Sequence, residues 1–233
     1  MSLHKHLAIG LAALLLSGCG YAQFYLYKLF GPDHHYVAAA SVLGAVPAPP
    51  APGSPEDKKD LETLFDWQAR RTSEDCGAAL AQAKAEYNAF FGDVSPFADP
   101  LPPDASRILF QVYFDGGMAV DAAKKRFARQ RPFRRDKGLK PCLGRVPGLS
   151  YPSGHAAVSR LFALLLSDVA PERRADFLAR SDRAALNRVI GGAHHPSDIE
   201  AGKRLGDAVY AGMLREASFR ADLARLKALA VER

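Results

Sequence analysis

The chain has 233 residues, of which 48% are hydrophobic, and it carries a formal net charge of +6. This length fits one domain with or without a leader, and the apolar fraction is that of a globular protein with a substantial core. Excess positive charge attracts phosphate-bearing substrates, anionic lipid or nucleic acid. The basic residues are interleaved with acidic ones and no nucleic-acid motif is present, so we expect no nucleic-acid partner.

The first residues have the pattern of an export signal. Lys5 stands between two histidines, and the apolar run over residues 7–16 is too short for an ordinary membrane span. The run ends in Leu-Ser-Gly-Cys at positions 16–19, which resembles the lipobox of bacterial lipoproteins. A plain signal peptide, cleaved after Ala22, is the alternative.

The lipobox resemblance implies a signal peptide over residues 1–18 and a lipidated Cys19 that begins a tether over residues 19–31. Gly20 rather than Asp follows the cysteine, which in Gram-negative bacteria favours the outer membrane. We therefore expect a periplasmic domain, attached to the membrane through an N-terminal lipid.

Downstream of a Pro-rich extended segment, apolar residues recur at helical spacing and no alternating strand pattern appears. The sequence therefore predicts an all-α globular domain. We expect helices from residue 56, over 73–91, from 104 or 106 to 131 with a break at Gly116-Gly117, from 154, over 171–190 and 196–214, and from 218.

The stretch from Arg188 to Asp198 combines a cation, an imidazole and a carboxylate at fixed offsets. Two glycines should end one helix and Pro196 begin the next, which places His194 in the joint, one turn from Asp198. A carboxylate there can accept one imidazole N–H and leave the other nitrogen as a nucleophile, while Arg188 offers a fork of donors to an oxyanion. Alternatively, Asp198 merely complements the helix N-terminus and His194 fills a gap.

The second informative stretch is Tyr-Pro-Ser-Gly-His at positions 151–155. Ser153 is a natural N-cap, and Gly154 lets a ligand approach the backbone. The first N–H groups of such a helix bind anions, with His155 beside them. The alternative is that His155 is a surface residue near a capped helix start.

Lys124 and Arg131 form the third candidate group. On a continuous helix their spacing places both on one side, about 10 Å apart along the axis. Cations on one helix face are often only a solvated stripe. We assign that role to three neighbours, Lys125, Arg126 and Arg129. Three cations of the following loop either face solvent or rim a site: Arg134, Arg135 and Lys137.

The three cysteines fit an oxidising compartment. If Cys19 is acylated, Cys76 and Cys142 remain as a candidate disulfide. Two isolated thiols are the alternative.

Together, the three stretches resemble the signature of the type 2 phosphatidic acid phosphatase superfamily. Its parts here are Lys124-x6-Arg131-Pro132, Pro152-Ser153-Gly154-His155 and Arg188-x5-His194-x3-Asp198. The chain is most similar to the bacterial class A nonspecific acid phosphatases, which it also resembles at Phe133, Ser150-Tyr151 and Arg188-Val189-Ile190. The resemblance implies one compact helical domain of the acid phosphatase/vanadium haloperoxidase type over residues 32–233.

The resemblance also implies a role for each residue. Five groups would hold the phosphate oxygens: Lys124, Arg131, Ser153, the Gly154 backbone N–H and Arg188. His194 would attack phosphorus and form a phosphohistidine, Asp198 would orient His194, and His155 would protonate the leaving oxygen. Three cations and a helix N-terminus can supply the positive charge that phosphoryl transfer needs, so we expect neither a metal ion nor a cofactor.

One position departs from the family pattern, and one is ambiguous. Asn187 stands where the family usually has Ser, so we leave it out of the site. His195 adjoins His194, but only His194 satisfies both the gap to Arg188 and the gap to Asp198. We therefore interpret His195 as a helix-cap or rim residue.

These inferences predict a metal-independent acid phosphatase for a broad range of phosphate monoesters, most active at acidic pH, where His155 is protonated. Three alternatives remain: a phosphatase for lipid phosphates or diphosphates, a vanadate-dependent haloperoxidase, and a catalytically silent anion-binding lipoprotein. The sequence leaves open the preferred ester and whether the chain forms a homo-oligomer.

Overall fold

The computed structural model describes residues 35–231, and all regular elements in this range are helical, which confirms the predicted fold class. From residue 36 onward, the described residues form one compact unit. The predicted signal peptide, Cys19 and the tether lie outside the described residues, as does the predicted domain boundary at residue 32.

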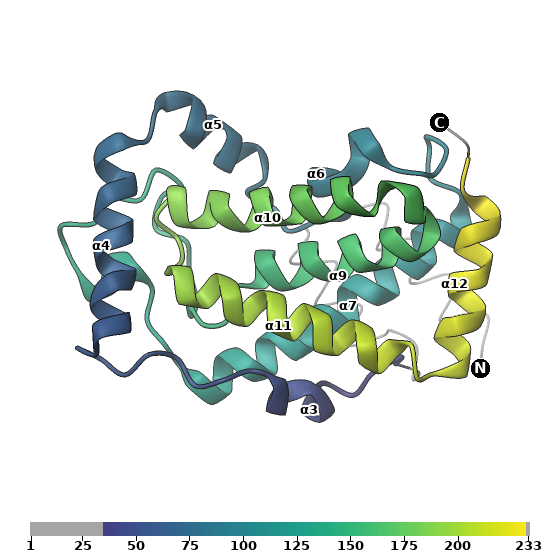
Figure 1. Ribbon diagram of the computed structural model, residues 1–233, viewed down its shortest axis with the longest axis horizontal. Helices are drawn as coiled ribbons and strands as arrows, with labels where there is room; N and C mark the ends of the chain where they lie inside the picture. Colours follow the sequence, from purple (N-terminus) through teal and green to yellow (C-terminus); the bar gives the residue numbers. More distant parts are fainter. Residues whose placement is uncertain (1–34, 232–233) are drawn as a thin grey trace, which may run out of the picture. The chain divides into compact units, whose positions relative to one another are not determined.

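The helices follow one another in a simple order along the chain (Figure 1). They are α3 (Ala39–Val42), η1 (Leu43–Ala45), α4 (Pro55–Arg70), α5 (Ser73–Ala81), α6 (Tyr87–Phe91), η2 (Gly92–Val94), α7 (Pro103–Phe127), α8 (Pro132–Arg135), α9 (Gly154–Val169), η3 (Pro171–Arg173), α10 (Arg174–Ile190), α11 (Pro196–Met213) and α12 (Ala217–Leu229).

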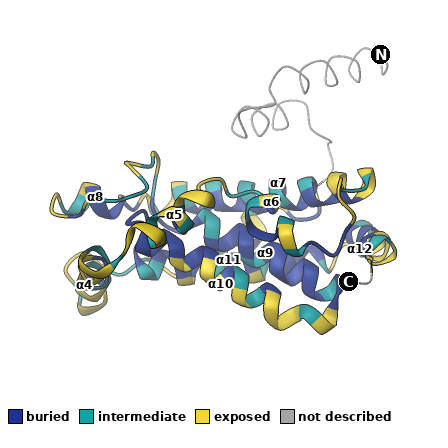
Figure 2. Cartoon of the chain, turned by 90° about the horizontal axis from the view of Figure 1, so that it is seen from above, coloured by how far each residue is buried: buried dark blue, intermediate teal, exposed yellow. Residues whose placement is uncertain are grey.

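The central helix of this unit is α9. It lies beside α10 and α11, with α7 behind it, while α4 and α12 cross the two ends of this layer (Figure 1). Figure 2 shows α9 buried over most of its length. Its side chains Leu161, Phe162 and Leu165 are at most 1% exposed. Burial of each such side chain stabilises the fold by about 1.5–3 kcal/mol, which explains why the most apolar stretch of the C-terminal half occupies the centre.

Two glycines of α11 allow it to approach α9 closely. A Cβ atom at Gly202 would lie 2.5 Å from the carbonyl oxygen of Ser153, and one at Gly206 would lie 2.6 Å from that of Ala157. Any larger residue would push the two helices apart. This contact brings the first turns of α9 and α11 together, and these turns carry two of the three signature stretches.

The predicted interruption at Gly116-Gly117 is wrong, because α7 runs through both glycines without a break. Glycine costs helix stability, but here it serves packing. A Cβ at Gly116 would lie only 2.8 Å from Cδ2 of Leu161 on α9. Packing therefore overrides the local propensity.

The end of α7 also differs from the prediction. The helix stops at Phe127, and Ala128 adopts a left-handed conformation with φ of 49° while its N–H still bonds to the Lys124 carbonyl. Arg131 consequently lies beyond the helix and serves as the N-cap residue of α8. Lys124 and Arg131 thus do not share one helix face, and the turn between them is what redirects Arg131.

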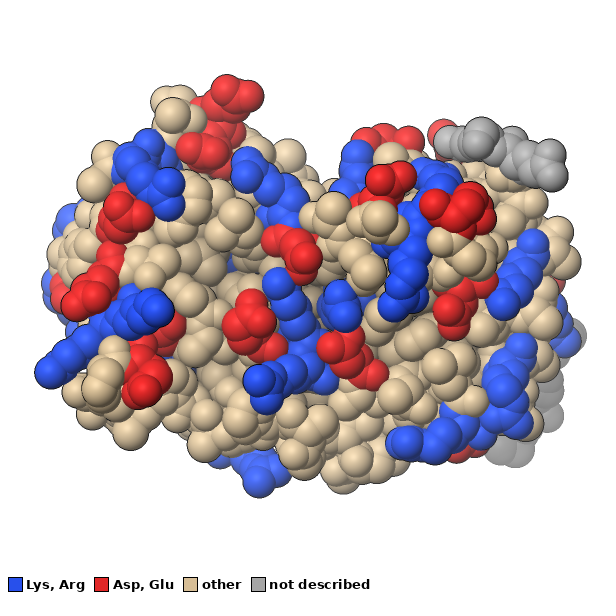
Figure 3. Space-filling view, viewed as in Figure 1, with Lys and Arg blue, Asp and Glu red and all other residues tan. Residues whose placement is uncertain are grey.

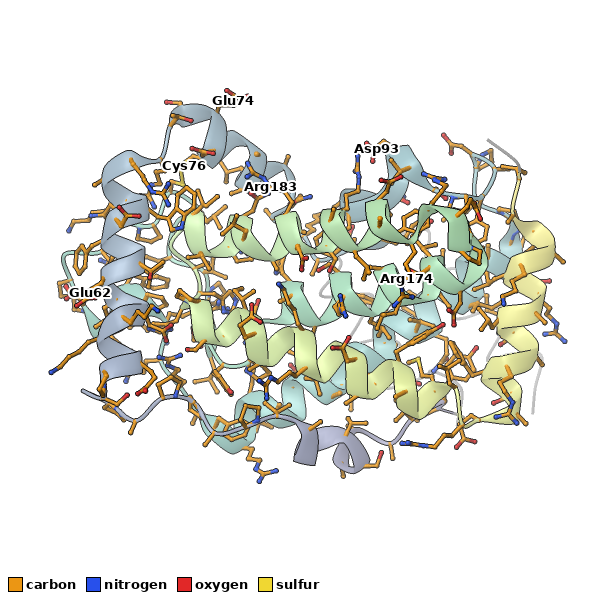
Figure 4. All side chains as sticks on the ribbon, in the orientation of Figure 1. Glu62, Glu74, Cys76, Asp93, Arg174 and Arg183 are labelled. Atoms are coloured by element: carbon orange, nitrogen blue, oxygen red, sulfur yellow. A yellow bond between two sulfur atoms is a disulfide. The ribbon has the colours of Figure 1, made fainter. Side chains whose placement is uncertain are left out.

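The segment over residues 73–91 forms two helices, α5 and α6, rather than the single predicted one. A capping box between Thr72 and Asp75 begins α5. Figure 4 shows Cys76 on α5 near one end of α10, and Arg183 rising from α10 toward α5. The residues between α5 and α6 are not helical, and two of them, Gln82 and Ala83, contact His155.

Lys and Arg side chains are interspersed with Asp and Glu over the face drawn in Figure 3. Several form ion pairs between helices, including Arg160 with Asp207 at 2.7 Å and Lys203 with Asp182 at 2.8 Å. This face therefore does not present one continuous field of a single sign.

Candidate active site

The first turns of α9 and α11 meet through a backbone hydrogen bond. Ser153 caps α9, and its hydroxyl accepts a hydrogen bond from the Ala156 N–H at 3.3 Å. The Ser153 N–H donates to the carbonyl oxygen of Asp198 at 2.9 Å. The predicted anion-binding helix start thus lies directly against the residue predicted to orient the nucleophile.

His194 lies in the turn between α10 and α11, one helical turn before Asp198. Its Nδ1 is 3.3 Å from Oδ2 of Asp198, and its Nε2 is 2.6 Å from Nη1 of Arg131. A guanidinium can only donate, so Nε2 accepts and Nδ1 carries the proton. The predicted pairing therefore leaves a lone pair on Nε2, facing a cation.

The turn that places His194 depends on Gly192, which has a φ of 75°. A Cβ at this position would also lie 3.0 Å from Cα of Pro141. Both the left-handed backbone and the close approach require glycine. The Ala193 and His194 N–H groups then bond to the carbonyl oxygen of Arg188, at 2.9 Å and 3.3 Å.

The electrostatics of the pair favour a neutral imidazole beside an ionised carboxylate. Burial lowers the pKa of His194 well below its usual value, and the charges of Arg131 and Lys124 lower it further. Burial raises the pKa of Asp198, but its interactions with His194 and His195, hydrogen bonds first among them, together hold it well below the usual range. The lone pair on Nε2 of His194 therefore stays unprotonated at acidic pH.

Two cations, Arg131 and Lys124, act on His194, and a third, Arg188, acts on His155. Arg131 donates to the carbonyl oxygens of Ala193 and Pro147, at 3.0 Å and 3.1 Å. Lys124 Nζ donates to the Leu149 carbonyl oxygen at 2.6 Å. Burial, followed by the charge of Arg131, lowers the pKa of Lys124 to about 7.

Arg188 is the third cation and is only 2% exposed. Its charge acts on His155, as does that of Arg131, whereas Arg131 and Lys124 act on His194. The two histidines thus share Arg131 as a charged neighbour. The structure therefore brings the predicted site residues of all three stretches into one cationic cluster.

His155 stands on the first turn of α9, and its Nε2 contacts the carbonyl oxygens of Gln82 and Ala83 at 3.0 Å and 3.2 Å. Nε2 must carry a proton to donate to these oxygens. Burial and the charges of Arg188 and Arg131 lower its pKa to about 3. In this form His155 is neutral at mildly acidic pH, which differs from the expectation of a protonated imidazole.

Arg129 does not belong to a solvated stripe, and that prediction is wrong. The side chain is buried, and it pairs with Asp57, Asp60 and Asp198. The left-handed turn at Ala128 is what points it inward, and no sequence pattern signals this turn. Arg135, for which the sequence leaves open both solvent exposure and the rim of a site, binds both carboxylate oxygens of Asp57 at 2.7 Å and 2.6 Å.

The sequence around this cluster matches a known family. Residues 106–219 match the sequence model of the PAP2 superfamily. An acid phosphatase of Zymomonas mobilis subsp. mobilis is 30% identical over 207 residues, covering 82% of this chain and 76% of that protein. The chain belongs to the PAP2 superfamily. A non-specific acid phosphatase of Salmonella typhi is 29% identical to this PAP2 protein over 199 residues, covering 78% of this chain and 77% of that protein.

The fold is shared with a solved structure. A bacterial vanadium-dependent iodoperoxidase superposes with a TM-score of 0.56 at 20% sequence identity, covering 76% of this chain. The PAP2 chain spans about half of that protein's length, 53%. At this identity the likeness concerns the helical fold alone.

His195 caps α11 as predicted, but it is fully buried and does not lie at a rim. Its Nδ1 is 3.1 Å from Oδ2 of Asp198, and its Nε2 is 3.1 Å from Nη1 of Arg135. Because the guanidinium donates, the proton of neutral His195 is on Nδ1 and is directed at Asp198. Asp198 therefore binds two imidazoles through the same oxygen.

Asn187, the departure from the family pattern, is buried and donates from Nδ2 to Oε1 of Gln82 at 2.9 Å. The carbonyl oxygen of the same Gln82 contacts His155. Asn187 is thus linked to His155 through the segment between α5 and α6, a contact that the signature motif does not reveal.

Cys76 and Cys142 are joined by a disulfide. It ties α5 to the segment that packs on the Gly191-Gly192 turn, where a Cβ at Gly191 would lie 2.3 Å from Cδ1 of Leu143. The disulfide is therefore linked through a few residues to the turn that places His194.

Two further properties concern residues 35–231 only. No helix there is both long and apolar enough to cross a bilayer. No cluster of three or more His, Cys, Asp or Glu side chains there has the arrangement of a metal site.

Proposed function

We propose that this acid phosphatase of the PAP2 superfamily hydrolyses phosphate monoesters through a phosphohistidine on His194. The observation that carries the proposal is the position of His194 between Asp198 on Nδ1 and Arg131 on Nε2. The first fixes the tautomer, and the second marks where negative oxygen atoms would be held.

The substrate's phosphoryl group would bind among Lys124, Arg131 and Arg188, at the N-terminus of α9. Ser153 and the Gly154 backbone N–H stand at this helix start. Phosphoryl transfer needs an in-line nucleophile and positive charge on the equatorial oxygens, and these groups supply both. The proposed mechanism is therefore metal-independent.

In the first step, the Nε2 lone pair of His194 forms a bond to phosphorus. The bond from phosphorus to the ester oxygen breaks, its electron pair stays on that oxygen, and His155 supplies the proton. In the second step, a water oxygen attacks phosphorus, its proton passes to His155, and the P–N bond breaks to return the pair to Nε2. Asp198 stabilises the positive charge that His194 carries in between.

His155 must be protonated to act as the acid, although its pKa in this form is about 3. Two of the causes are the positive charges of Arg188 and Arg131. A phosphate dianion between these cations would offset them, so we expect a higher pKa in the complex. The Gln82 and Ala83 carbonyls hold one proton on Nε2, so the proton given to the leaving oxygen would be the second one, which Nδ1 carries in the protonated imidazole.

The decisive experiment measures hydrolysis of an aryl phosphate in excess EDTA by the wild type and by His194→Ala. We expect turnover by the wild type and a loss of about 10⁴-fold or more for the variant, as for other enzymes that lose a covalent nucleophile. Lys125→Ala, which changes an exposed neighbour of the site, is the control. Equal turnover by wild type and His194→Ala would show that the proposed chemistry is wrong.

We also propose that substrate range is broad and that water-soluble monoesters are preferred. A lipid phosphate or diphosphate is the rival substrate, suggested by the lipobox at residues 16–19. Comparing kcat/KM for a soluble monoester and a long-chain lipid phosphate separates the two. Halide oxidation with vanadate and peroxide tests the haloperoxidase alternative, for which we expect no activity above background.

We further propose that the protein is exported and anchored through Cys19, in the outer membrane and facing the periplasm. The Leu-Ser-Gly-Cys sequence supports this, and the disulfide between Cys76 and Cys142 suits an oxidising compartment. Cys19→Ser should abolish lipid labelling and release the protein from membrane fractions. Unchanged fractionation would favour a plain signal peptide.

A further inference from the structure

A buried arginine, Arg129, holds the second oxygen of the Asp198 carboxylate. Arg129 donates from Nη1 to Oδ1 of Asp198 at 2.8 Å and to the hydroxyl of Ser197 at 2.7 Å. Its Nη2 donates to Oδ1 of Asp57 at 3.0 Å and Oδ2 of Asp60 at 2.9 Å. One guanidinium thus joins the start of α11 to α4.

The two oxygens of Asp198 have separate partners. Oδ2 accepts from the Ser150 hydroxyl at 2.5 Å and from the His195 N–H at 2.8 Å, and it faces Nδ1 of His194. Oδ1 accepts from Arg129. The terminal torsion of an aspartate is soft, so the plane of the carboxylate is set by what holds both oxygens. A rigid guanidinium fork is well suited to that task.

The carboxylates of α4 are what keep Arg129 in place. Asp60 also accepts from the Ser197 N–H at 3.0 Å, and it is bonded to the Ser197 hydroxyl. Asp57 is shared with Arg135, whose fork lowers the pKa of this carboxyl well below its usual range. The guanidinium of Arg129 is therefore compensated on three sides, as a buried charge must be.

This cluster lies beside the phosphate-facing residues rather than among them. A hollow of about 370 Å³ adjoins the cluster and is lined by Arg129, Arg135, Phe127 and the prolines that precede α4. Moreover, Asp57 and Asp60 precede residues 106–219, the part that matches the superfamily model. The signature motif therefore does not include the carboxylates that hold Arg129.

We propose that Arg129 is a positioning residue for phosphoryl transfer, because with Asp57 and Asp60 it holds the Asp198 carboxylate so that Oδ2 meets Nδ1 of His194. This inference rests on the proposed function of His194. Arg129 touches neither His194 nor the groups we assign to phosphate, so it acts through Asp198. It should therefore affect the reactivity of the bound complex more than the affinity for substrate.

The test compares Arg129→Gln and Arg129→Lys with the wild type. We expect kcat to fall by about 10- to 100-fold, as when outer partners of site residues are removed elsewhere, with KM changed by less than about threefold because no substrate contact is lost. Circular dichroism measures the folded fraction of each variant, so that kcat refers to folded enzyme. Arg129→Lys keeps the positive charge but lacks the planar guanidinium, so its kcat should fall as well.

The tautomer of His194 can be measured directly by NMR spectroscopy. The chain contains 7 histidines, so ¹⁵N-histidine labelling gives few signals, and His194→Ala assigns the one of interest. The wild type should show His194 protonated on Nδ1, and Arg129→Gln should weaken this signal in favour of the other tautomer. An unchanged His194 signal together with an unchanged kcat would overturn the proposal.

Two controls separate positioning from stability. Asp222→Asn removes another buried carboxylate, which binds Tyr36 and Arg107 away from the site, and it should lower Tm while leaving kcat unchanged. In an Asp198→Asn background, Arg129→Gln should add little further loss, because its effect passes through Asp198. Additive losses, or a lower Tm with wild-type kcat of the folded enzyme, would refute positioning. If His194→Ala were fully active, the proposed function itself would fail instead.

Discussion

Nη1 of Arg131 lies 2.6 Å from Nε2 of His194, so the guanidinium donates to the same lone pair that the proposed reaction needs. A phosphate oxygen must draw this donor away before Nε2 can reach phosphorus. Arg131 thus has two effects, since it holds charge on the substrate and keeps the nucleophile neutral.

Two variants, Arg131→Lys and Arg131→Gln, test the two effects. Loss of one transition-state donor can cost roughly 3 kcal/mol, so we expect kcat/KM to fall about 100-fold. Arg131→Gln removes the charge as well and should raise the pKa of His194, because Arg131 is one cause of its depression. The acidic limb of the pH–kcat/KM profile should then move to higher pH. A limb that stays in place in Arg131→Gln would contradict this.

Lys124 should set an upper pH limit for activity. Its pKa is lowered to about 7, so the side chain is charged below that pH and loses its proton above it. Because the cation is needed for phosphate, kcat/KM of the free enzyme should fall as pH rises through about 7. Lys124→Arg should extend the active range upward, whereas the exposed Lys125→Arg should leave the profile unchanged. An alkaline limb that is the same in both variants would assign it to another group.

The contact between α9 and α11 should not tolerate a methyl group. Gly202→Ala places a Cβ 2.5 Å from the Ser153 carbonyl oxygen, so we expect destabilisation of about 1–3 kcal/mol and lower activity. Gly77→Ala on α5 meets nothing within 4 Å and should raise stability by up to about 1 kcal/mol. Urea denaturation of the two variants measures the difference. Equal midpoints would mean that the helices can separate without cost.

The disulfide should contribute to stability and, less strongly, to activity. Cys76 and Cys142 are 66 residues apart, and closing a loop of this length restricts the unfolded chain by about 4 kcal/mol in the chain-entropy model. The double variant Cys76→Ser, Cys142→Ser should lower Tm and make it insensitive to dithiothreitol, which should lower Tm in the wild type. If dithiothreitol left the wild-type Tm unchanged, the bond would have no such role.

The sequence by itself determined the features that depend on neighbouring residues. Helical spacing of apolar residues predicted an all-α domain, and Ser153 and Pro196 marked the starts of α9 and α11. His194 and Asp198 are four positions apart at a helix start, so their pairing follows from local geometry. The superfamily also follows from the sequence, because the three signature stretches occur in the right order and at the right spacing.

Only the tertiary structure decided which cations face the site. Arg129 and Arg131 are two positions apart in one loop, yet the left-handed turn at Ala128 directs one to α4 and the other to His194. Gly116 remains helical because Leu161 packs against it. His155 is neutral because burial and the charges of two arginines lower its pKa. These outcomes depend on groups distant in sequence, whose packing and charge appear in no local pattern.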